Sequence, residues 1–175
     1  MVGLERGTVE LEPYDEGWAR LYEEERERLK HVAGDRFLDF EHIGSTAIKG
    51  MPAKPIIDIL AVVEDLDESR YLTPVLEECG FEYRPEEVEG RLFFAKGPRT
   101  NRTYYLSVTE RGSDFYEEKI AFRDYLSQHP KAAERYASLK TRLAEKYPEN
   151  RGQYTRKKGQ FVQDVLDLAI DDSES

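Results

Sequence analysis

Cysteine, histidine and long apolar runs are all scarce in this chain of 175 residues. Cys79 is the single cysteine, so neither a disulfide framework nor a cysteine-based zinc site can form, and we expect it on the apolar face of a helix. His31 and His129 lack metal-ligand spacing, and the chain has no Walker loop, paired-histidine motif or Ser-His-Asp order. These absences exclude the commonest motif-based enzyme and metal classes.

Membrane and secretion signals are also missing. No apolar run approaches the roughly 18 residues that cross a bilayer. The first residues, MVGLERGTVEL, lack the apolar core of a signal peptide. We therefore expect a cytoplasmic protein that makes no membrane contact.

A basic excess is absent too, because 36 acidic residues face 26 basic ones and the net charge is −10. Broad binding to duplex DNA needs a basic face, so we do not expect duplex nucleic acid as a partner. The hydrophobic fraction of 39% and the length suit one domain with a full core. We expect residues 1–175 to form that single domain, with a core over about 8–170 and a disordered tail over 171–175.

The chain alternates strand and helix patterns first and becomes helical after about residue 113. The patterns predict strands over 8–11 (at an edge), 37–43, 56–63, 81–84, 91–96 and 103–109. They predict helices over 16–33, 68–79, 114–128, from Pro130 to about 147, and 152–170. We therefore predict an α+β (α/β-like) fold with a mixed sheet of about five strands and a C-terminal helical layer.

Asp58 is the residue that most needs a function, since it lies inside the apolar run 56–63. A carboxylate in a buried strand is costly unless it is paired, bound to a metal or at a wet edge. It is therefore either a metal ligand or a structural acid that pairs with Lys54 or an arginine. His42 either hydrogen-bonds Asp58 across neighbouring strands or is a satisfied buried histidine, and we favour the second reading.

A Gly-Ser pair, Gly44-Ser45, precedes Asp58 by about a dozen residues. Glycine permits close backbone approach, and successive amides in such a turn can bind a phosphate oxygen. Gly-Ser alone is a weak signal that ordinary turns also produce, so its value lies in its distance from Asp58.

The string HIGSTAIKGMPAKPIIDIL resembles the GrpB-like family of the nucleotidyltransferase superfamily. The resemblance continues in FRDYLSQHPKAAERYASLK and YTRKKGQFV, and so covers roughly residues 9–170. It implies a nucleotidyltransferase-type fold in which Gly44 and Ser45 hold phosphates and Asp58 binds Mg²⁺. It further implies that a nucleotidyl group is transferred from a nucleoside triphosphate to a hydroxyl.

The sequence departs from the superfamily pattern where further metal-binding acids are expected. The second acid normally stands two residues after the first, where this chain has Leu60, and the strand 103–109 contains no acid. Related GrpB-like sequences look histidine-rich in that strand, where this chain has Tyr104, Tyr105 and Ser107. The alternative is therefore a catalytically degenerate module that binds a nucleotide or a coenzyme A precursor, since GrpB-like domains resemble a part joined to some dephospho-CoA kinases.

Basic residues near the predicted strand ends supply candidate phosphate contacts, with a solvated rim as the alternative for each. They are Lys54, Arg91, Lys96, Arg99 and Arg102. The ending of the family also resembles Tyr154, Lys158 and Phe161, which implies that Lys158 lies near the pocket. We expect a nucleotide or another phosphorylated small molecule to contact Gly44, Ser45, Lys54, Arg102 and Lys158.

Overall fold

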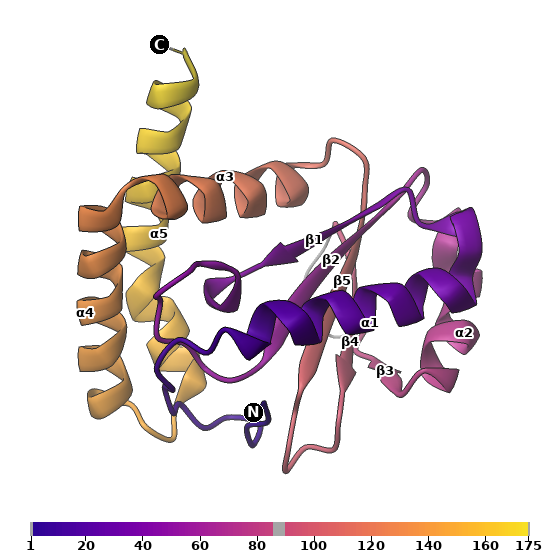
Figure 1. Ribbon diagram of the computed structural model, residues 1–175, viewed down its shortest axis with the longest axis horizontal. Coiled ribbons are helices and arrows are strands. Elements are labelled where there is room, and N and C mark those ends of the chain that lie inside the picture. Colours follow the sequence, from indigo (N-terminus) through magenta and orange to yellow (C-terminus); the bar gives the residue numbers. More distant parts are fainter. Residues whose placement is uncertain (1, 86–89, 175) are drawn as a thin grey trace.

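The computed structural model describes residues 2–85 and 90–174. Within these ranges, five strands form one sheet in the order β1-β2-β5-β4-β3 (Figure 1). The strands are β1 (Asp39–Ile43), β2 (Ile57–Val63), β3 (Phe81–Tyr83), β4 (Leu92–Lys96) and β5 (Tyr104–Glu110). β2 and β5 run parallel, and the other neighbouring strands run antiparallel. The predicted α+β fold with a mixed five-stranded sheet is therefore confirmed.

Helices cover the sheet and extend beyond it. They are α1 (Gly17–Ala33), α2 (Thr73–Glu78), α3 (Asp114–Gln128), α4 (Pro130–Lys146) and α5 (Arg151–Glu174). Figure 1 shows α1 along one face of the sheet, with α4 and α5 side by side in a separate layer that α3 joins to the sheet. Short 3-10 turns lie at Gly34–Arg36, Ser45–Ala47 and Glu68–Leu72.

Alternation along β2 separates the main core from the opposite face of the sheet. Ile57, Ile59 and Ala61 are buried in one apolar cluster with Trp18 and Leu29 of α1. Because successive strand residues point to opposite faces, Asp58 points away from this core. The face that bears Asp58 is therefore the one turned toward the C-terminal helices.

The C-terminal helical layer has its own apolar cluster. Ile48 and Met51, from the loop that follows β1, pack with Leu126 of α3, Tyr136 of α4 and Val165 of α5. The loop between β1 and β2 is thus held between the sheet and the helical layer, and it brings the Gly-Ser pair to their junction.

Three local predictions differ from the structure. The edge strand over 8–11 is wrong: the Val9 N–H donates to the Pro148 carbonyl (2.7 Å), and the Val9 side chain packs on Leu143 and Tyr154. The helix over 68–79 is divided into a 3-10 turn and α2, since Pro74 stands in the first turn of α2 and has no N–H to continue an earlier helix. The last helix, predicted over 152–170, extends from Arg151 to Glu174 as α5; the disordered tail over 171–175 stays a prediction, and residue 175 lies outside the described residues.

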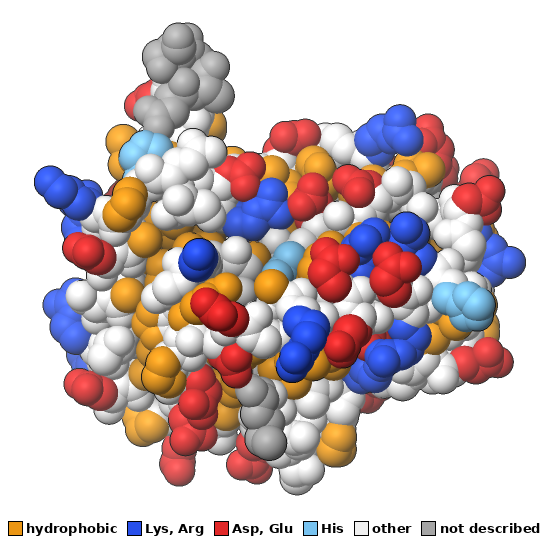
Figure 2. All heavy atoms as spheres, viewed as in Figure 1, with side chains coloured by type: hydrophobic (Ala, Val, Ile, Leu, Met, Phe, Trp, Pro, Cys, Tyr) orange, Lys and Arg blue, Asp and Glu red, His pale blue; other side chains and the backbone are white. Residues whose placement is uncertain are grey.

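The surface over α1 mixes both signs of charge, as Figure 2 shows on this face of the molecule. Arg26 pairs with Glu23 and Glu27 on the exposed side of the helix. On the buried side, the Glu25 carboxylate accepts a hydrogen bond from Lys96 (2.7 Å) and also pairs with Arg28. Among the described residues, no helix is long and apolar enough to span a bilayer.

Candidate functional site

A cavity of about 430 Å³ lies between the Asp58 face of the sheet and the C-terminal helices. Its walls come from the turn after β1, the loop before β2, and side chains of β2, β5, α3, α4 and α5. The opening of the cavity lies between α3 and α5, because the exposed lining residues belong to these two helices. They are Glu118, Lys119, Thr155, Gly159 and Gln163. We call this space the lysine cavity, for the four lysines described below.

Gly44 and Asp58 form one compact corner of the lysine cavity. Ile43 of β1 pairs with Asp58 of β2, so the next residue, Gly44, lies directly beside the carboxylate. The Gly44 backbone has φ 74° and ψ −174°, a conformation that only glycine adopts readily. A Cβ at this position would lie 2.5 Å from Oδ2 of Asp58. Backbone geometry and packing therefore both require glycine here.

Four lysines reach the lysine cavity from four different segments: Lys54 from the loop before β2, Lys119 from α3, Lys140 from α4 and Lys158 from α5. Lys140 is fully buried, and its Nζ donates to the Pro52 carbonyl (2.5 Å). Lys54 and Lys158 are partly buried, and Lys119 is exposed at the opening.

Aromatic rings hold these amines in place. The Nζ atoms of Lys158 and Lys54 lie 4.4 Å and 5.4 Å from the centre of the Tyr154 ring. Lys140 Nζ lies 5.0 Å from the centre of the Tyr136 ring. Such cation–π contacts stabilise an ammonium group that lacks a carboxylate partner.

Burial shifts the protonation of the amines in the lysine cavity. It lowers the pKa of Lys140 to about 7, and the nearby Lys54 acts in the same direction. Burial also lowers the pKa of Lys54 to about 8, aided by Arg151. The pKa of Lys158 falls well below its ordinary value because burial and the neighbouring lysines both disfavour its charge. An anion in the cavity would reverse these shifts, since it favours the charged amines.

The cavity lining contains fewer carboxylates than lysines: Asp58 and Glu118 are the two acids among its described residues. Burial raises the pKa of Asp58, and the charges of Lys54 and Lys119 oppose that shift. The second carboxylate of the lining, Glu118, is exposed at the opening. The predicted salt bridge between Asp58 and Lys54 does not form between these two described residues, and Lys54 affects Asp58 through space.

The residues present do not fit a resident Mg²⁺ ion. Leu60 shares the face of Asp58, and the β5 partners of these two residues are Ser107 and Tyr105, so none of the neighbouring positions supplies a carboxylate. In residues 2–85 and 90–174, no three His, Cys, Asp or Glu side chains come together to hold a metal ion. Lysines surround the single half-buried acid, Asp58, instead, and they repel a cation.

The structure brings five of the six expected site residues to the lysine cavity: Gly44, Ser45, Lys54, Asp58 and Lys158. Arg102 is the exception. Its buried guanidinium donates to the Gly97 carbonyl (2.6 Å) and pairs with Glu82 (3.1 Å). Arg102 therefore stabilises the turn between β4 and β5 and does not line the cavity. The binding roles of the other five stay predictions.

His42 does not contact Asp58, because it pairs with Ile59 in the ladder and points to the α1 face of the sheet. Its Nε2 lies 2.9 Å from Oγ1 of Thr46, and its ring stacks on Tyr22 at 4.7 Å between centres. Burial and the charge of Arg123 lower the pKa of His42 to about 4. His42 is thus a satisfied, neutral histidine, as favoured from the sequence.

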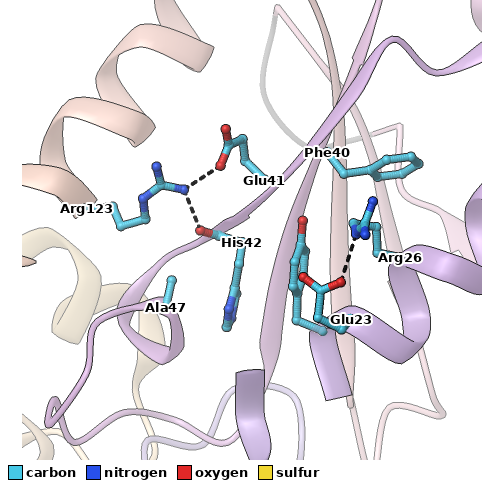
Figure 3. Close-up of a pocket in the computed structure, with 8 residues that line it drawn as sticks. Glu23, Arg26, Phe40, Glu41, His42, Ala47 and Arg123 are labelled. Atoms are coloured by element: carbon cyan, nitrogen blue, oxygen red, sulfur yellow. Dashed lines mark hydrogen bonds and ion pairs between the residues drawn. The ribbon is translucent and has the colours of Figure 1, made fainter. Parts of the chain in front are cut away.

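A second pocket of about 430 Å³, which we call the outer pocket, lies on the other side of the same turn, against α1 and β1. Figure 3 shows Arg123 directed at Glu41 and the His42 carbonyl, with distances of 2.7 Å and 3.0 Å. Arg26 pairs with Glu23 at 3.1 Å. The charged side chains of the outer pocket are therefore paired with one another.

Lys119 and Lys140 belong to the site but were missed in the sequence. Each follows an aromatic residue by four positions, as Lys158 follows Tyr154, and each lies over that ring. Residues four apart share a helix face. The sequence signal for these residues is a lysine four positions after an aromatic residue in each of the three C-terminal helices.

Comparison with known sequences gives one family match. The family described as GrpB protein matches residues 8–168. The glutamate-rich protein GrpB of Alkalihalophilus pseudofirmus is 40% identical over 171 residues, which cover 95% of this chain and 98% of that protein.

Comparison with solved structures extends the match to the fold. The crystal structure of the conserved protein GrpB from Enterococcus faecalis superposes with a TM-score of 0.87 and 32% identity, and covers 95% of this chain and 100% of that one. The Cid1 poly(U) polymerase, in a structure bound to MgATP, matches with a TM-score of 0.53 and 15% identity over 77% of this chain and 44% of that one. At that identity the likeness to Cid1 concerns the fold, which is therefore of the nucleotidyltransferase type.

Proposed function

Because the chain belongs to the GrpB family and has a nucleotidyltransferase-type fold, we propose that its lysine cavity binds a nucleotide or another phosphorylated small molecule. The observation that supports this most is the arrangement of four lysines around one half-buried carboxylate in a single cavity. Cationic clusters of this kind favour phosphate groups as ligands.

The volume and the lining of the cavity suit a small ligand. Its volume of about 430 Å³ falls in the range of small-molecule sites. Tyr136 and Tyr154 supply aromatic surface, and Phe122 and Val162 supply apolar surface. In this proposal the Gly44-Ser45 turn contacts the phosphate groups through its backbone amides, and the apolar lining accommodates the rest of the ligand.

Binding without chemistry is the function that the residues support best, because the acids that nucleotidyl transfer requires are missing beside Asp58. An accessory module of this kind would hold a nucleotide or a coenzyme A precursor. Nucleotidyl transfer is the second candidate, favoured by the position of Asp58 beside the Gly-Ser turn within this fold. A product formed from a labelled nucleoside triphosphate, and lost in Asp58→Ala, would establish transfer.

Thermal unfolding against a panel of phosphorylated compounds tests the binding proposal. The panel contains nucleoside mono-, di- and triphosphates, coenzyme A and its precursors, and pyrophosphate. A ligand at about 100 times its Kd stabilises a protein by about 2.7 kcal/mol. For a chain of this size that corresponds to a rise in Tm of roughly 5–10 °C.

Lys158→Met is the variant that should lose the ligand-induced rise in Tm. Lys157→Met is the matched control, because Lys157 is the exposed neighbour on the same helix and does not line the cavity. The proposal fails if no phosphorylated compound raises the Tm of the unmodified protein, or if Lys158→Met responds like the control.

A further inference from the structure

The sheet side of the lysine cavity lacks the acids that would bind a metal ion, so the negative charge of a ligand must be neutralised in another way. In the nucleotidyltransferase-type fold, the face of β2 that bears Asp58 is where a metal-binding set of acids would stand. Here Leu60, fully buried, occupies the next position on that face, and Ser107, also buried, lies across from it on β5. The Ser107 hydroxyl accepts a hydrogen bond from Arg91 (2.7 Å). Arg91 therefore brings a positive charge to this position of β5, and that charge also acts on Asp58.

Positive charge replaces the missing acids around the cavity. Lys54, Lys119 and Lys158 all act electrostatically on Asp58, and each comes from a different segment of the chain. Lys140 completes the set from α4. When these amines are protonated, their charge exceeds that of Asp58 and the exposed Glu118 together. A divalent cation entering the cavity would meet this repulsion, whereas a chain of phosphates would be attracted by it.

One residue that lines the lysine cavity has a buried hydroxyl group without a hydrogen-bond partner among the described residues. Tyr154 is fully buried and lines the cavity, and its hydroxyl has no hydrogen-bond partner among the described residues. Buried polar groups without a partner are rare in folded proteins, and a bound ligand is one way in which such a group is satisfied. A phosphate oxygen that came within reach of this hydroxyl would accept its hydrogen bond.

On the basis of the proposed function, we propose that the lysine cavity recognises a diphosphate or longer phosphate chain without Mg²⁺, the lysine ammonium groups taking the place of metal ions. Lys54 and Lys158, which share the ring of Tyr154, bind one part of the chain. Lys140, over Tyr136, binds the other. Lys119 at the opening attracts the ligand as it enters.

Calorimetric titration with pyrophosphate, in EDTA and in excess MgCl₂, tests the role of the metal. We expect pyrophosphate to bind in EDTA, and more weakly by about tenfold when excess Mg²⁺ neutralises its charge. Orthophosphate should bind at least about tenfold more weakly than pyrophosphate, because it engages fewer amines. Binding that EDTA abolishes and Mg²⁺ restores would overturn the inference and leave the proposed function intact. Equal affinity for orthophosphate and pyrophosphate would overturn the preference for a phosphate chain.

Substitution of the amines separates this inference from a general attraction of anions. Lys140→Met should weaken pyrophosphate binding in EDTA by about 10- to 100-fold, the range for a lost hydrogen bond to a charged group. Lys157→Met should leave it unchanged. Equal affinities of the two variants would contradict the assignment. A failure of every phosphorylated compound to bind, with or without Mg²⁺, would instead remove the proposed function itself.

Discussion

The lysine cavity and the outer pocket have the same volume, about 430 Å³, and share the turn after β1, yet they differ in how their charges are balanced. In the outer pocket, Arg123 pairs with Glu41 and Arg26 pairs with Glu23. In the lysine cavity, four lysines surround one half-buried acid, Asp58. Charge pairing, and not size, distinguishes the two spaces.

Only the lysine cavity lowers the stability of the free protein, because its amines have no carboxylate partners among the described residues. Paired and hydrogen-bonded charges hold the outer pocket together in the free protein. Amines without a carboxylate partner, of which Lys140 is fully buried, destabilise the free protein, and such features persist where function requires them. The outer pocket is therefore read as part of the scaffold and the lysine cavity as the binding site.

The largest effect on this comparison should come from Gly44→Ala, because the turn forms a wall of both spaces. We expect a loss of about 3 kcal/mol in the free energy of unfolding, from backbone strain and from displacement of the Asp58 carboxylate. Urea unfolding measures the loss. Gly50→Ala is the control, since Gly50 also has a positive φ, 84°, but no atom lies within 4 Å of its added Cβ.

Backbone strain alone should make Gly50→Ala cost about 1–2 kcal/mol. The difference between the two variants then reports the contact of Gly44 with Asp58. Equal losses would mean that Asp58 moves aside freely and that the corner described above is not rigid.

Arg123→Met should have the next largest effect and should act on stability alone. It leaves Glu41 without its partner and removes the hydrogen bond to the His42 carbonyl. We expect a destabilisation of about 2 kcal/mol, as for other lost hydrogen bonds between charged groups. Ligand-induced stabilisation by phosphorylated compounds should persist in this variant. Loss of the ligand response would show that the outer pocket also takes part in binding.

Lys140→Met should change stability in the opposite direction. Replacing an unpaired buried amine with an apolar side chain of similar length should stabilise the free protein by about 1 kcal/mol, after the loss of its hydrogen bond to Pro52. Thermal unfolding without ligand should then show a Tm higher by about 2–4 °C. A destabilised Lys140→Met would assign Lys140 to the scaffold, with Arg123.

The sequence predicts the fold well and the site in part, for reasons that particular residues make clear. The apolar run at β2 and the caps and prolines of the helices act locally, so element order and the mixed sheet follow from them. Asp58 and Gly44 are adjacent because β1 and β2 pair, which the Gly-Ser spacing and the family resemblance both indicate.

Lys140 and Arg102 show where sequence reasoning fails. Lys140 lies in a helix of many charged residues, and its burial depends on how α4 packs against the loop at Pro52. Arg102 stands near a strand end, as a phosphate contact would, but the turn at Gly97 uses its guanidinium. Both outcomes depend on tertiary contacts that no local pattern encodes.

The smallest expected effect is a pH dependence that differs in sign between the free and the bound protein. The pKa values of Lys140 and Lys54 fall to about 7 and about 8 on folding, so in the free protein the unfolded state binds more protons above these values. Their contribution to stability therefore rises with pH from about 7 until the pH passes their unfolded-state pKa of 10.5. The other ionisable groups around them are Asp58, Tyr105, Glu118, Lys119, Lys158, Arg151, Tyr136 and Tyr154.

An anionic ligand favours the protonated amines and is therefore bound with proton uptake. The stabilisation that it adds consequently changes with pH in the opposite direction. Ligand-induced stabilisation should therefore decrease over the same pH range, by a few degrees in Tm. The double variant Lys54→Met/Lys140→Met is the reference, because subtracting its pH profile removes the contribution of all other groups. Parallel profiles for the variant and the unmodified protein would mean that both amines keep ordinary pKa values, and that the lysine cavity is charged before its ligand arrives.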